Sequence, residues 1–336
     1  MKMATIKDVA KRTGLSLTTV SKYLNGIKVK EANKTAIDAA IADLGYSVNG
    51  LARGLRTGQS HTIGVVIPDF SGIFTTTILS YAEDFLIDNG YNLIVSDCRS
   101  DIEREVKALQ TLLTRQVDGV INMPSNVSGS HLLPAIEKNI PVVLIDRLIP
   151  SLEDKVNAVL VDNLTASEEA TQLLIDAGHK DIGIILGPEH ISTFKQRLTG
   201  YSNALEKNGI DLNPQYVHFA RRSTTQYGYD ITMEMLSRTK PTALFATNHY
   251  MSLGAVMALN ELRLSIPQDI AIVAYDDLPA SRVIKPKLTL VAQPLEAIAQ
   301  CVSEIMLAAI ESKRENKCQE PVVKVLKAEI KKGESV

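Results

Sequence analysis

The sequence contains few cysteines and no pair of residues at metal-binding spacing. Its three cysteines, Cys98, Cys301 and Cys318, are widely separated and form no CxxC motif. This pattern is typical of a reducing compartment and argues against a disulfide framework or a cysteine metal site. The six histidines include no HxxxH or HExxH pair. We therefore expect no metal ion and no other cofactor.

Long apolar runs and enzyme motifs are also missing. No apolar run approaches the roughly 18 residues of a membrane-spanning helix. The first residues, MKMATIKDVAKR, lack the apolar core and small-residue cleavage site of a signal peptide. There is no GxGxxG, GxxxxGK[ST] or GxSxG motif. These absences predict a cytoplasmic protein with no membrane partner and no catalytic residues, which is not an enzyme.

The small net charge hides a strong asymmetry between the two ends of the chain. The chain has 336 residues, a length that predicts two or three domains, and a formal net charge of −2. Residues 1–60 contain ten Lys and Arg against four Asp and Glu, whereas the remainder contains 26 against 34. A basic head on an acidic body is expected when only the head meets a polyanion.

Residues 1–48 carry the pattern of three short helices. Thr5 can cap the first helix and Ser16 the second, with a turn at Gly14 between them. The third helix is expected from about Ala32 to Leu44. Each helix has an apolar stripe that we expect to face the other two: Ile6, Val9, Ala10, Val20, Tyr23, Leu24, Ile37, Ala40, Ile41 and Leu44. This is the helix-turn-helix arrangement, although a plain helical packing unit has the same pattern.

The outer face of the second helix has short side chains where an ordinary solvated helix has long ones. It presents Leu17, Thr18, Ser21 and Lys22. Short hydroxyls and a single lysine allow a helix to enter a DNA major groove, while capping hydroxyls and helix N-termini bind phosphates. We therefore predict that this face reads double-stranded DNA.

The next segment, NGLARGLRTGQSHT at residues 49–62, is a poor helix by itself. It has an apolar stripe of Leu51 and Leu55, and its two glycines each cost about 1 kcal/mol in a helix. We expect it to become helical only when held, as a hinge whose Leu55 is wedged between minor-groove base steps. A plain flexible linker remains the alternative.

Residues 4–58 resemble the DNA-binding head of the lac repressor (LacI/GalR) family. The resemblance rests on TIKDVAKRTGLSLTTVSKYLNG, on LGY at 44–46 and on LARGLR at 51–56. Lys22 stands where the family usually has Arg, so a bidentate contact to guanine is lost. The resemblance implies DNA contacts from Thr5, Ser16, Leu17, Thr18, Thr19, Ser21, Lys22, Asn25, Asn49, Ala52, Leu55 and Arg56.

From Thr62 onward, short β-rich runs alternate with helical stretches. This alternation predicts parallel sheets with helices on both faces. The runs are too numerous for one sheet, so we expect two sequential α/β lobes, with late strands at 288–294 and 320–330 that cross between them. The predicted architecture is an all-α helix-turn-helix domain (1–48), a hinge (49–60) and a periplasmic-binding-protein-like body (61–336) of two doubly wound parallel-sheet lobes.

Ligands of such sheets bind beyond the carboxyl ends of the strands. Planar amide, carboxylate and guanidinium groups at these ends, with Phe70 and Phe74 as a stacking face, suit a polyhydroxylated ligand such as a sugar. Any one of the polar groups can equally be an ordinary strand-end residue that satisfies loop backbone. The strand-end candidates are Asp69, Phe70, Asp97, Pro124, Ser125, Asp146, Arg147, Asp162, Asn248 and Asp276.

The body resembles the same family through PVVLIDR, GHKDIGIILGP, QRLTGYSNAL, ATNHYMSLGA, VAYDD and LTLVAQP, in the expected order. The sequence departs from the family pattern at two positions. Ala274 stands where the family commonly has Gly, and His249 stands where it usually has Asp. We predict that His249 is a surface substitution rather than an effector contact. By the resemblance, Arg197, Asn248 and Asp276 are the main polar contacts of an effector, and the cleft is also lined by Asp146, Arg147 and Gln293.

Together these patterns predict a dimeric transcription regulator that binds operator DNA and is most consistent with a repressor of a sugar-utilisation operon. No apolar heptad follows Ile330, so a homodimer is expected rather than a tetramer. A small-molecule effector between the lobes would control DNA binding. The alternatives are an effector that is a nucleobase, a sugar phosphate or a phosphocarrier protein. A sugar-binding protein or a sugar-modifying enzyme is a further alternative, disfavoured by the basic head and the missing enzyme motifs.

Overall fold

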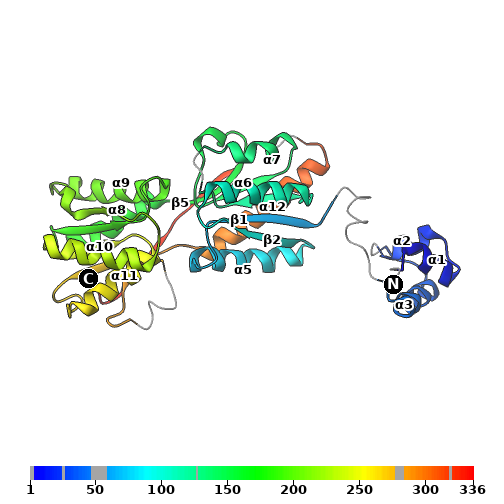
Figure 1. The fold of residues 1–336 in the computed structure, drawn as a ribbon, viewed down its shortest axis with the longest axis horizontal. Helices are drawn as coiled ribbons and strands as arrows, with labels where there is room; N and C mark the ends of the chain where they lie inside the picture. The colour runs from blue at the N-terminus through cyan, green and yellow to red at the C-terminus, as the bar shows by residue number, and fades with distance from the viewer. Residues whose placement is uncertain (1–3, 25–26, 47–58, 126–127, 277–283, 318–319) are drawn as a thin grey trace. The chain divides into compact units, whose positions relative to one another are not determined.

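The computed structural model describes residues 4–24, 27–46, 59–125, 128–276, 284–317 and 320–336. The chain divides into two compact units, residues 1–61 and 62–336 (Figure 1). The predicted hinge at 49–60 lies almost entirely outside the described residues. No helix in the described ranges has the length and apolar character needed to cross a membrane.

The first unit is a bundle of three helices. They are α1 (Ile6–Thr13), α2 (Leu17–Leu24) and α3 (Glu31–Leu44). The Asp8 carboxylate accepts the Thr5 backbone N–H at 2.8 Å, and the Ser16 hydroxyl accepts the Thr19 N–H at 3.1 Å. Both bonds satisfy amides that a helix start leaves without partners. Gly14 ends α1 at φ 67°, a left-handed conformation that suits glycine.

The predicted apolar stripes of this unit meet in one small core. Val9, Val20, Ile37 and Ala40 are buried, and the other stripe residues pack around them. The three predicted helices and their inward faces are therefore confirmed. The core orients α2 so that its opposite face, beginning at Leu17, is exposed.

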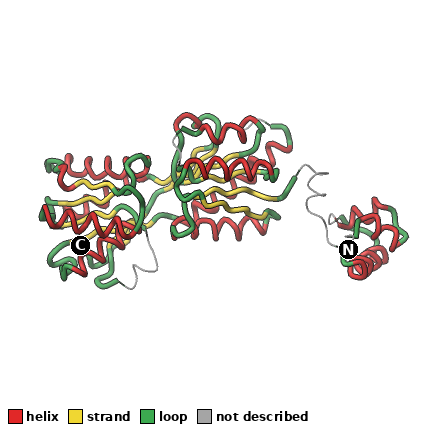
Figure 2. The backbone as a smooth tube through the Cα atoms, viewed as in Figure 1, coloured by secondary structure: helices red, strands yellow, loops and turns green. Residues whose placement is uncertain are grey.

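The second unit consists of two α/β lobes, each with a six-stranded sheet between layers of helices (Figure 2). The sheet of the first lobe is parallel, with strand order β2-β1-β3-β4-β5-β11. Helices α5 and α12 pack on one face of this sheet, and α6 and α7 on the other. The elements of this lobe are β1 (Thr62–Ile67), α5 (Ile73–Asp88), β2 (Asn92–Asp97), α6 (Ile102–Thr114), β3 (Gly119–Asn122), α7 (Leu133–Glu137), β4 (Val142–Ile145), β5 (Asn157–Val161), α12 (Leu295–Arg314) and β11 (Val323–Leu326).

The second lobe repeats this order as β7-β6-β8-β9-β10-β12. Helices α8 and α9 cover one face and α10 and α11 the other (Figure 1). Short 3₁₀ turns occur at Ser130–Leu132 and Pro150–Leu152 in the first lobe and at Pro214–Tyr216 in the second. The elements of this lobe are α8 (Asn163–Asp176), β6 (Ile182–Leu186), α9 (Ser192–Lys207), β7 (Val217–Phe219), α10 (Thr225–Arg238), β8 (Ala243–Ala246), α11 (His249–Glu261), β9 (Ala271–Tyr275), β10 (Thr289–Ala292) and β12 (Glu329–Lys331).

The expectation of two sequential lobes is wrong, whereas the predicted crossings between the lobes at 288–294 and 320–330 are confirmed. The chain passes between them three times, after β5, after β10 and after β11. Helix α12 returns to the first lobe because its apolar face, including Ile298, Val302 and Met306, completes the core under that sheet. The run at 320–330 is two strands, one in each sheet, and β12 pairs antiparallel with β10. The three-residue edge strand β7 was not predicted, because it is too short to show a period.

The remaining predicted strands are confirmed, and their composition follows from their surroundings. Strand β6 (IGIIL) is buried at every position, as expected when helices cover both faces of a parallel sheet. In the helix layer, a Cβ at Gly200 would lie 2.2 Å from the carbonyl oxygen of Leu164. Only glycine therefore allows α9 to approach α8 this closely, and this approach brings Arg197 beside Asn163.

Candidate functional site

A cavity of about 550 Å³ lies between the two lobes of the second unit. It opens where β1 and β3 end in the first lobe and where β6 and β8 end in the second. These are the points at which the strand order reverses and where open α/β sheets bind ligands. The cavity lining includes nine of the ten predicted effector contacts: Asp69, Phe74, Ser125, Asp146, Arg147, Arg197, Asn248, Asp276 and Gln293.

Several other strand-end residues do not reach the cavity. Phe70 is 52% exposed and does not line it, so only Phe74 supplies the predicted aromatic face. Asp97 accepts the backbone N–H of Arg99, and Asp162 accepts that of Thr165 as the cap of α8. These two aspartates fit the ordinary alternative, in which a strand-end carboxylate satisfies loop backbone.

Arg197 is held rigidly on α9 and is only 3% exposed. Its Nε donates to Asn163 Oδ1 at 2.8 Å, its Nη1 donates to the carbonyl of Thr247, and its Cζ lies 3.7 Å from the centre of the Tyr275 ring. The cation–π contact and the hydrogen bonds fix the plane of the guanidinium. Asn163 and Tyr275 were missed in the sequence, because both are distant from Arg197 along the chain.

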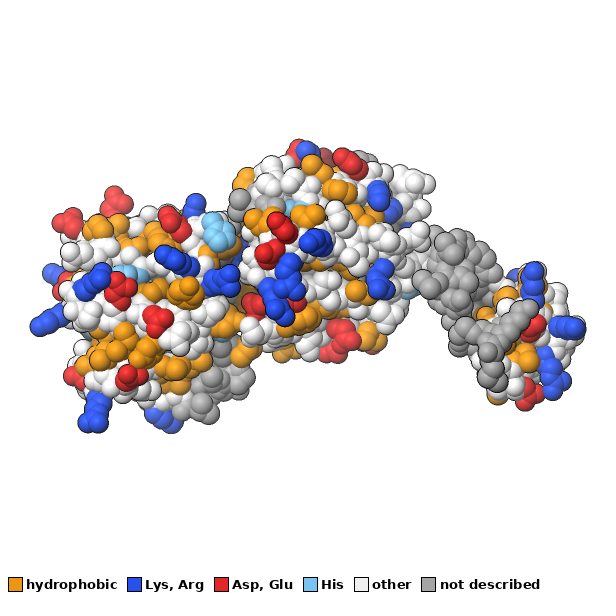
Figure 3. Space-filling view, viewed as in Figure 1, with side chains coloured by type: hydrophobic (Ala, Val, Ile, Leu, Met, Phe, Trp, Pro, Cys, Tyr) orange, Lys and Arg blue, Asp and Glu red, His pale blue; other side chains and the backbone are white. Residues whose placement is uncertain are grey.

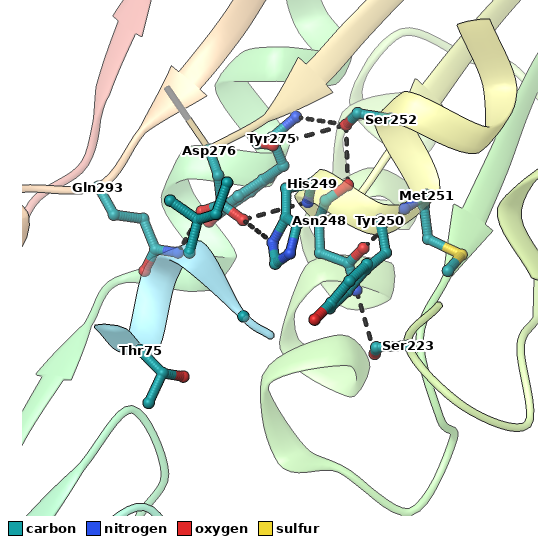
Figure 4. A network of polar contacts seen from close by, with 12 residues as sticks. Thr75, Ser223, Asn248, His249, Tyr250, Met251, Ser252, Tyr275, Asp276 and Gln293 are labelled. Carbon is teal, nitrogen blue, oxygen red and sulfur yellow. Dashed lines mark hydrogen bonds and ion pairs between the residues drawn. The ribbon is translucent and has the colours of Figure 1, made fainter. Parts of the chain in front are cut away.

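Both carboxylate oxygens of Asp276 have hydrogen-bond partners in the cavity wall (Figure 4). Its Oδ1 accepts Gln293 Nε2 at 2.7 Å, and its Oδ2 accepts the His249 backbone N–H at 3.2 Å. Burial by itself would raise the pKa of Asp276, but hydrogen bonding to His249, the charge of Arg197 and the Gln293 amide together lower the pKa below its ordinary value. The group is therefore a carboxylate at neutral pH, ready to accept hydrogen bonds.

Asp146 occupies the corresponding position in the first lobe. Asp146 follows β4 at φ 70° and Asp276 follows β9 at φ 73°, a left-handed conformation in which aspartate is enriched. The Asp146 carboxylate pairs with Arg147 Nε at 3.1 Å, and Arg147 Nη1 donates to the carbonyl of Pro124 at 2.9 Å. The two lobes thus present similar acidic turns to the same cavity.

The prediction that His249 is a surface substitution is wrong. Its side chain is 11% exposed, lines the cavity and places Nδ1 3.6 Å from Asp276 Oδ2. The ring packs against that of Tyr250, with 3.8 Å between the ring centroids and 37° between the ring planes. The reason is helix geometry: Asn248 caps α11 by accepting the Met251 N–H at 2.8 Å, and the first turn that follows faces the cavity.

Tyr250 forms a contact across the two lobes. Its hydroxyl donates to Asp69 Oδ1 at 3.1 Å and lies 3.0 Å from Ser71 Oγ. Burial, together with the Asp69 charge, raises the pKa of Tyr250 to about 12 despite the opposing Ser71 hydrogen bond. The phenol therefore stays neutral and can donate at neutral pH. Nothing in the sequence indicates this contact, which joins residues 181 positions apart.

A buried polar cluster supports Ser125 from behind. Glu105 Oε2 accepts the Ser125 N–H at 3.2 Å, and Glu105 Oε1 accepts Asn122 Nδ2 at 3.0 Å. His131 Nε2 lies 3.2 Å from Glu105 Oε1, and both side chains are fully buried. The cluster fixes the end of β3, where Ser125 enters the cavity wall. Sequence reasoning missed it because Glu105 resembles an ordinary surface residue of an amphipathic helix.

Two buried atoms of the cavity wall have no partner within the described part of the chain. They are Oε1 of Gln293 and Nε2 of His249. Buried polar atoms normally have hydrogen-bond partners. A ligand with hydroxyl groups can supply both, because a hydroxyl donates one hydrogen bond and accepts others.

The predicted DNA-binding residues of the first unit fall into two groups. Thr5, Ser16, Leu17, Thr18 and Lys22 are exposed, and Thr19 and Ser21 are half-buried beside them. Leu17 is 44% exposed, so its side chain is accessible at the start of α2. The other five predicted residues lie outside the described residues: Asn25, Asn49, Ala52, Leu55 and Arg56.

Comparison with known families decides the identity of the chain. Residues 5–49 match the model of bacterial regulatory proteins of the lacI family, and residues 60–328 match the periplasmic binding proteins and sugar binding domain of the LacI family. The chain belongs to the LacI family. This LacI-family regulator is therefore a DNA-binding transcription regulator and not an enzyme.

Relatives and solved structures agree with this assignment. The regulator is 34% identical to the HTH-type transcriptional repressor PurR of Proteus mirabilis, over 94% of this chain and 92% of that protein. It is 32% identical to the ribose operon repressor of Haemophilus influenzae, over 94% of both chains. A crystal structure of the lac repressor dimer bound to operator and the anti-inducer ONPF matches with a TM-score of 0.87 and 25% identity, over 99% of both chains.

Proposed function

We propose that this regulator is a cytoplasmic homodimer that represses a sugar-utilisation operon and is controlled by a small hydroxylated effector bound between its lobes. The observation that carries the effector assignment is the cavity wall, where fixed planar groups surround two buried polar atoms without partners. The observation that supports operator binding is the exposed, short-chained face of α2 on a basic unit.

In the DNA-bound dimer, the second helix of each head enters the major groove of one half-site. Leu17, Thr18 and Lys22 contact base edges, because they form the exposed face of α2. Capping and neighbouring hydroxyls contact phosphates, which makes the affinity salt-dependent. These are Thr5, Ser16, Thr19 and Ser21, together with Asn25. In the hinge, Leu55 wedges into the minor groove, supported by Asn49, Ala52 and Arg56.

In the cleft, the effector donates to Asp276 and to Gln293 Oε1 and accepts from Arg197 and Asn248. All four groups are oriented before binding by their protein partners, so little conformational entropy is lost. Phe74 offers an apolar face to the ring of the ligand. Binding that favours one arrangement of the lobes over another by about 1–3 kcal/mol changes operator affinity 5- to 150-fold.

A nucleobase is a second candidate effector. Several aromatic rings line the cavity, among them those of Phe74, Phe194, His249 and Tyr250, and such rings can stack on a planar base. The amide of Asn248 and the carboxylate of Asp276 are suitable partners for its edges. A sugar remains the better match, because its hydroxyl groups can both donate and accept at the two unpartnered atoms of the wall.

The decisive experiment measures operator binding by the full-length protein with and without candidate effectors. Genomic fragments are titrated by fluorescence anisotropy at several salt concentrations, with random duplex as the control. We expect a preferred fragment, a steep salt dependence and a change in affinity with one class of compound from a panel of sugars and nucleobases. Equal affinity for all duplexes would show that the protein is not a sequence-specific regulator.

A further inference from the structure

Two corresponding loops place arginines at the edge of the cavity. The loop after β2 and the start of α6 contribute Arg99 and Arg104, and the loop after β7 contributes Arg221 and Arg222. Strands β2 and β7 occupy the same place in the strand order of their lobes. Each lobe therefore contributes two arginines to the cavity from the equivalent place beside its own sheet. The sugar contacts described above make no use of these four side chains.

The first loop is held in an uncommon conformation. Arg99 and Ser100 have φ values of 52° and 53°, in the left-handed region that few non-glycine residues adopt. Backbone hydrogen bonds hold the loop against the end of β1, from Cys98 N to the Ile67 carbonyl at 2.9 Å and from Ser100 N to the Pro68 carbonyl at 2.8 Å. Unfavourable backbone of this kind is concentrated at functional sites. Here it presents Arg99 to the cavity.

The second loop is fixed at both ends. Ala220 N donates to the Leu186 carbonyl at 2.8 Å, beside the end of β6. Ser223 Oγ accepts Asn248 Nδ2 at 3.3 Å, and Thr224 caps α10 by accepting the Tyr227 N–H. Arg221 and Arg222 lie between these anchors. The residue after Arg222 is thus bonded through its hydroxyl to Asn248, a residue of the cavity wall.

The charges of the cavity do not cancel. Its lining contains six arginines and four aspartates, with no lysine or glutamate. Each aspartate already accepts a hydrogen bond from a neighbour: Asp69 from Gly72 N, Asp101 from Arg104 N, Asp146 from Arg147 Nε and Asp276 from Gln293 Nε2. In contrast, no guanidinium of Arg99, Arg104, Arg221 or Arg222 has a hydrogen bond or ion pair with any described residue.

In Figure 3, Lys and Arg side chains lie on both sides of the groove between the lobes of the second unit, with Asp and Glu side chains among them. Positive charge on both walls of a cleft focuses the field within it and attracts anions. The unengaged charge at this groove therefore favours a ligand that carries negative charge at its outer end.

We propose that the effector is a phosphorylated sugar, whose phosphate is bound at the cavity edge by Arg99, Arg104, Arg221 and Arg222. This proposal rests on the proposed function, since it names the effector class of the same cleft. The sugar hydroxyls bind to the groups named above: Arg197, Asn248, Asp276 and Gln293. The phosphate binds to the four arginines at the cavity edge. A phosphate monoester fits better than a carboxylate, because its three terminal oxygens and charge of about −1.5 to −2 can engage guanidiniums from two separate loops.

The first test compares matched ligands on the full-length protein by calorimetry. Glucose, fructose, ribose and galactose are each compared with their phosphate esters, and glucose is also compared with gluconate. We expect one ester to bind at least tenfold more tightly than its parent sugar, and its affinity to fall as salt is raised. Tighter binding of a neutral sugar or of gluconate than of every ester would overturn the proposal, as would no binding of any ester.

The second test uses two double variants, R99Q/R104Q and R221Q/R222Q. Both should fold, because all four side chains are exposed. Each should weaken binding of the preferred ester about tenfold, as expected for loss of charge-assisted hydrogen bonds. Binding of the unphosphorylated sugar should stay within twofold. The matched control is R115Q. Arg115 is an exposed arginine of the first lobe, like Arg99 and Arg104, but it does not line the cavity. Equal weakening by R115Q, or parental affinity in both double variants, would refute the role of these loops.

Operator binding, measured on the same preparations, separates this proposal from the proposed function. Selective operator binding that responds only to a neutral sugar overturns the phosphate proposal and leaves the regulator intact. Loss of selective operator binding in every preparation overturns the proposed function itself. An operator response to the ester that disappears in the double variants supports both.

Discussion

Replacing Asp276 by Asn should disable the effector site without disturbing the DNA-binding unit. The substitution keeps the shape of the side chain, but removes the charge that accepts hydrogen bonds from Gln293 at 2.7 Å and from the His249 N–H at 3.2 Å. A hydrogen bond to a charged group contributes about 1.5–3 kcal/mol, so loss of one such bond to the effector weakens binding about 10- to 150-fold. Operator affinity without effector should change by less than about twofold, because the heads lie in a separate compact unit.

The assay is calorimetry with the effector and fluorescence anisotropy with the operator. The matched control is Asp269→Asn, at an exposed acid of the same lobe that accepts the Ser265 N–H at 2.7 Å and does not line the cavity. The control should retain the parental effector affinity. If Asp276→Asn also retained it, Asp276 would not be an effector contact, and the orientation of the cavity wall described above would be irrelevant to binding.

The same variant has a pH signature. Because the pKa of Asp276 is lower in the folded protein than in the unfolded chain, its ionisation stabilises the fold above the unfolded value of about 3.9. That stability is lost as the pH falls through the lower folded pKa. The difference in unfolding free energy between the parent and Asp276→Asn should therefore be constant near neutral pH and shrink in acid. Urea titrations at pH 7 and at the lowest pH where both proteins remain folded test this, and a difference that grows in acid contradicts it.

Four further substitutions test other parts of the account. Leu55→Ala should weaken operator binding at least tenfold with little change in effector affinity, and unchanged operator affinity would discard the minor-groove wedge. Lys22→Ala should relax sequence preference in a binding-site selection, whereas an unaltered sequence logo would remove it from base reading. Tyr250→Phe removes the hydrogen bond from Tyr250 to Asp69 between the lobes. Loss of this bond, about 1–2 kcal/mol, should alter effector affinity about 5- to 30-fold. Calorimetry that shows no change would mean that this contact does not couple the lobes. Gly200→Ala should lower the unfolding free energy by about 1–3 kcal/mol in urea titrations, because its Cβ would meet a backbone oxygen at 2.2 Å, and full parental stability would show that the helices can move apart.

Local sequence determined the elements and much of the cavity wall. Apolar spacing, Thr5 and Gly14 define the helices of the head, because capping and the 3.6-residue period act within a few positions of one another. Most central strands of the body, such as β6 and β9, are equally clear as short buried apolar runs. Polar residues directly after those runs, such as Asp146 and Asp276, reach the cavity because parallel strands end at one edge of a sheet.

Packing between distant segments decided the rest. The return of α12 to the first lobe depends on a core that needed one more helix, and no local pattern specifies which sheet a helix joins. The setting of Arg197 between Asn163 and Tyr275, and the bond from Tyr250 to Asp69, join residues 34 to 181 positions apart. Such contacts depend on how elements stack, so the sequence could name the strand-end groups but not their partners. It could not show that His249 faces the cavity, or that four arginines of two corresponding loops line the same cavity.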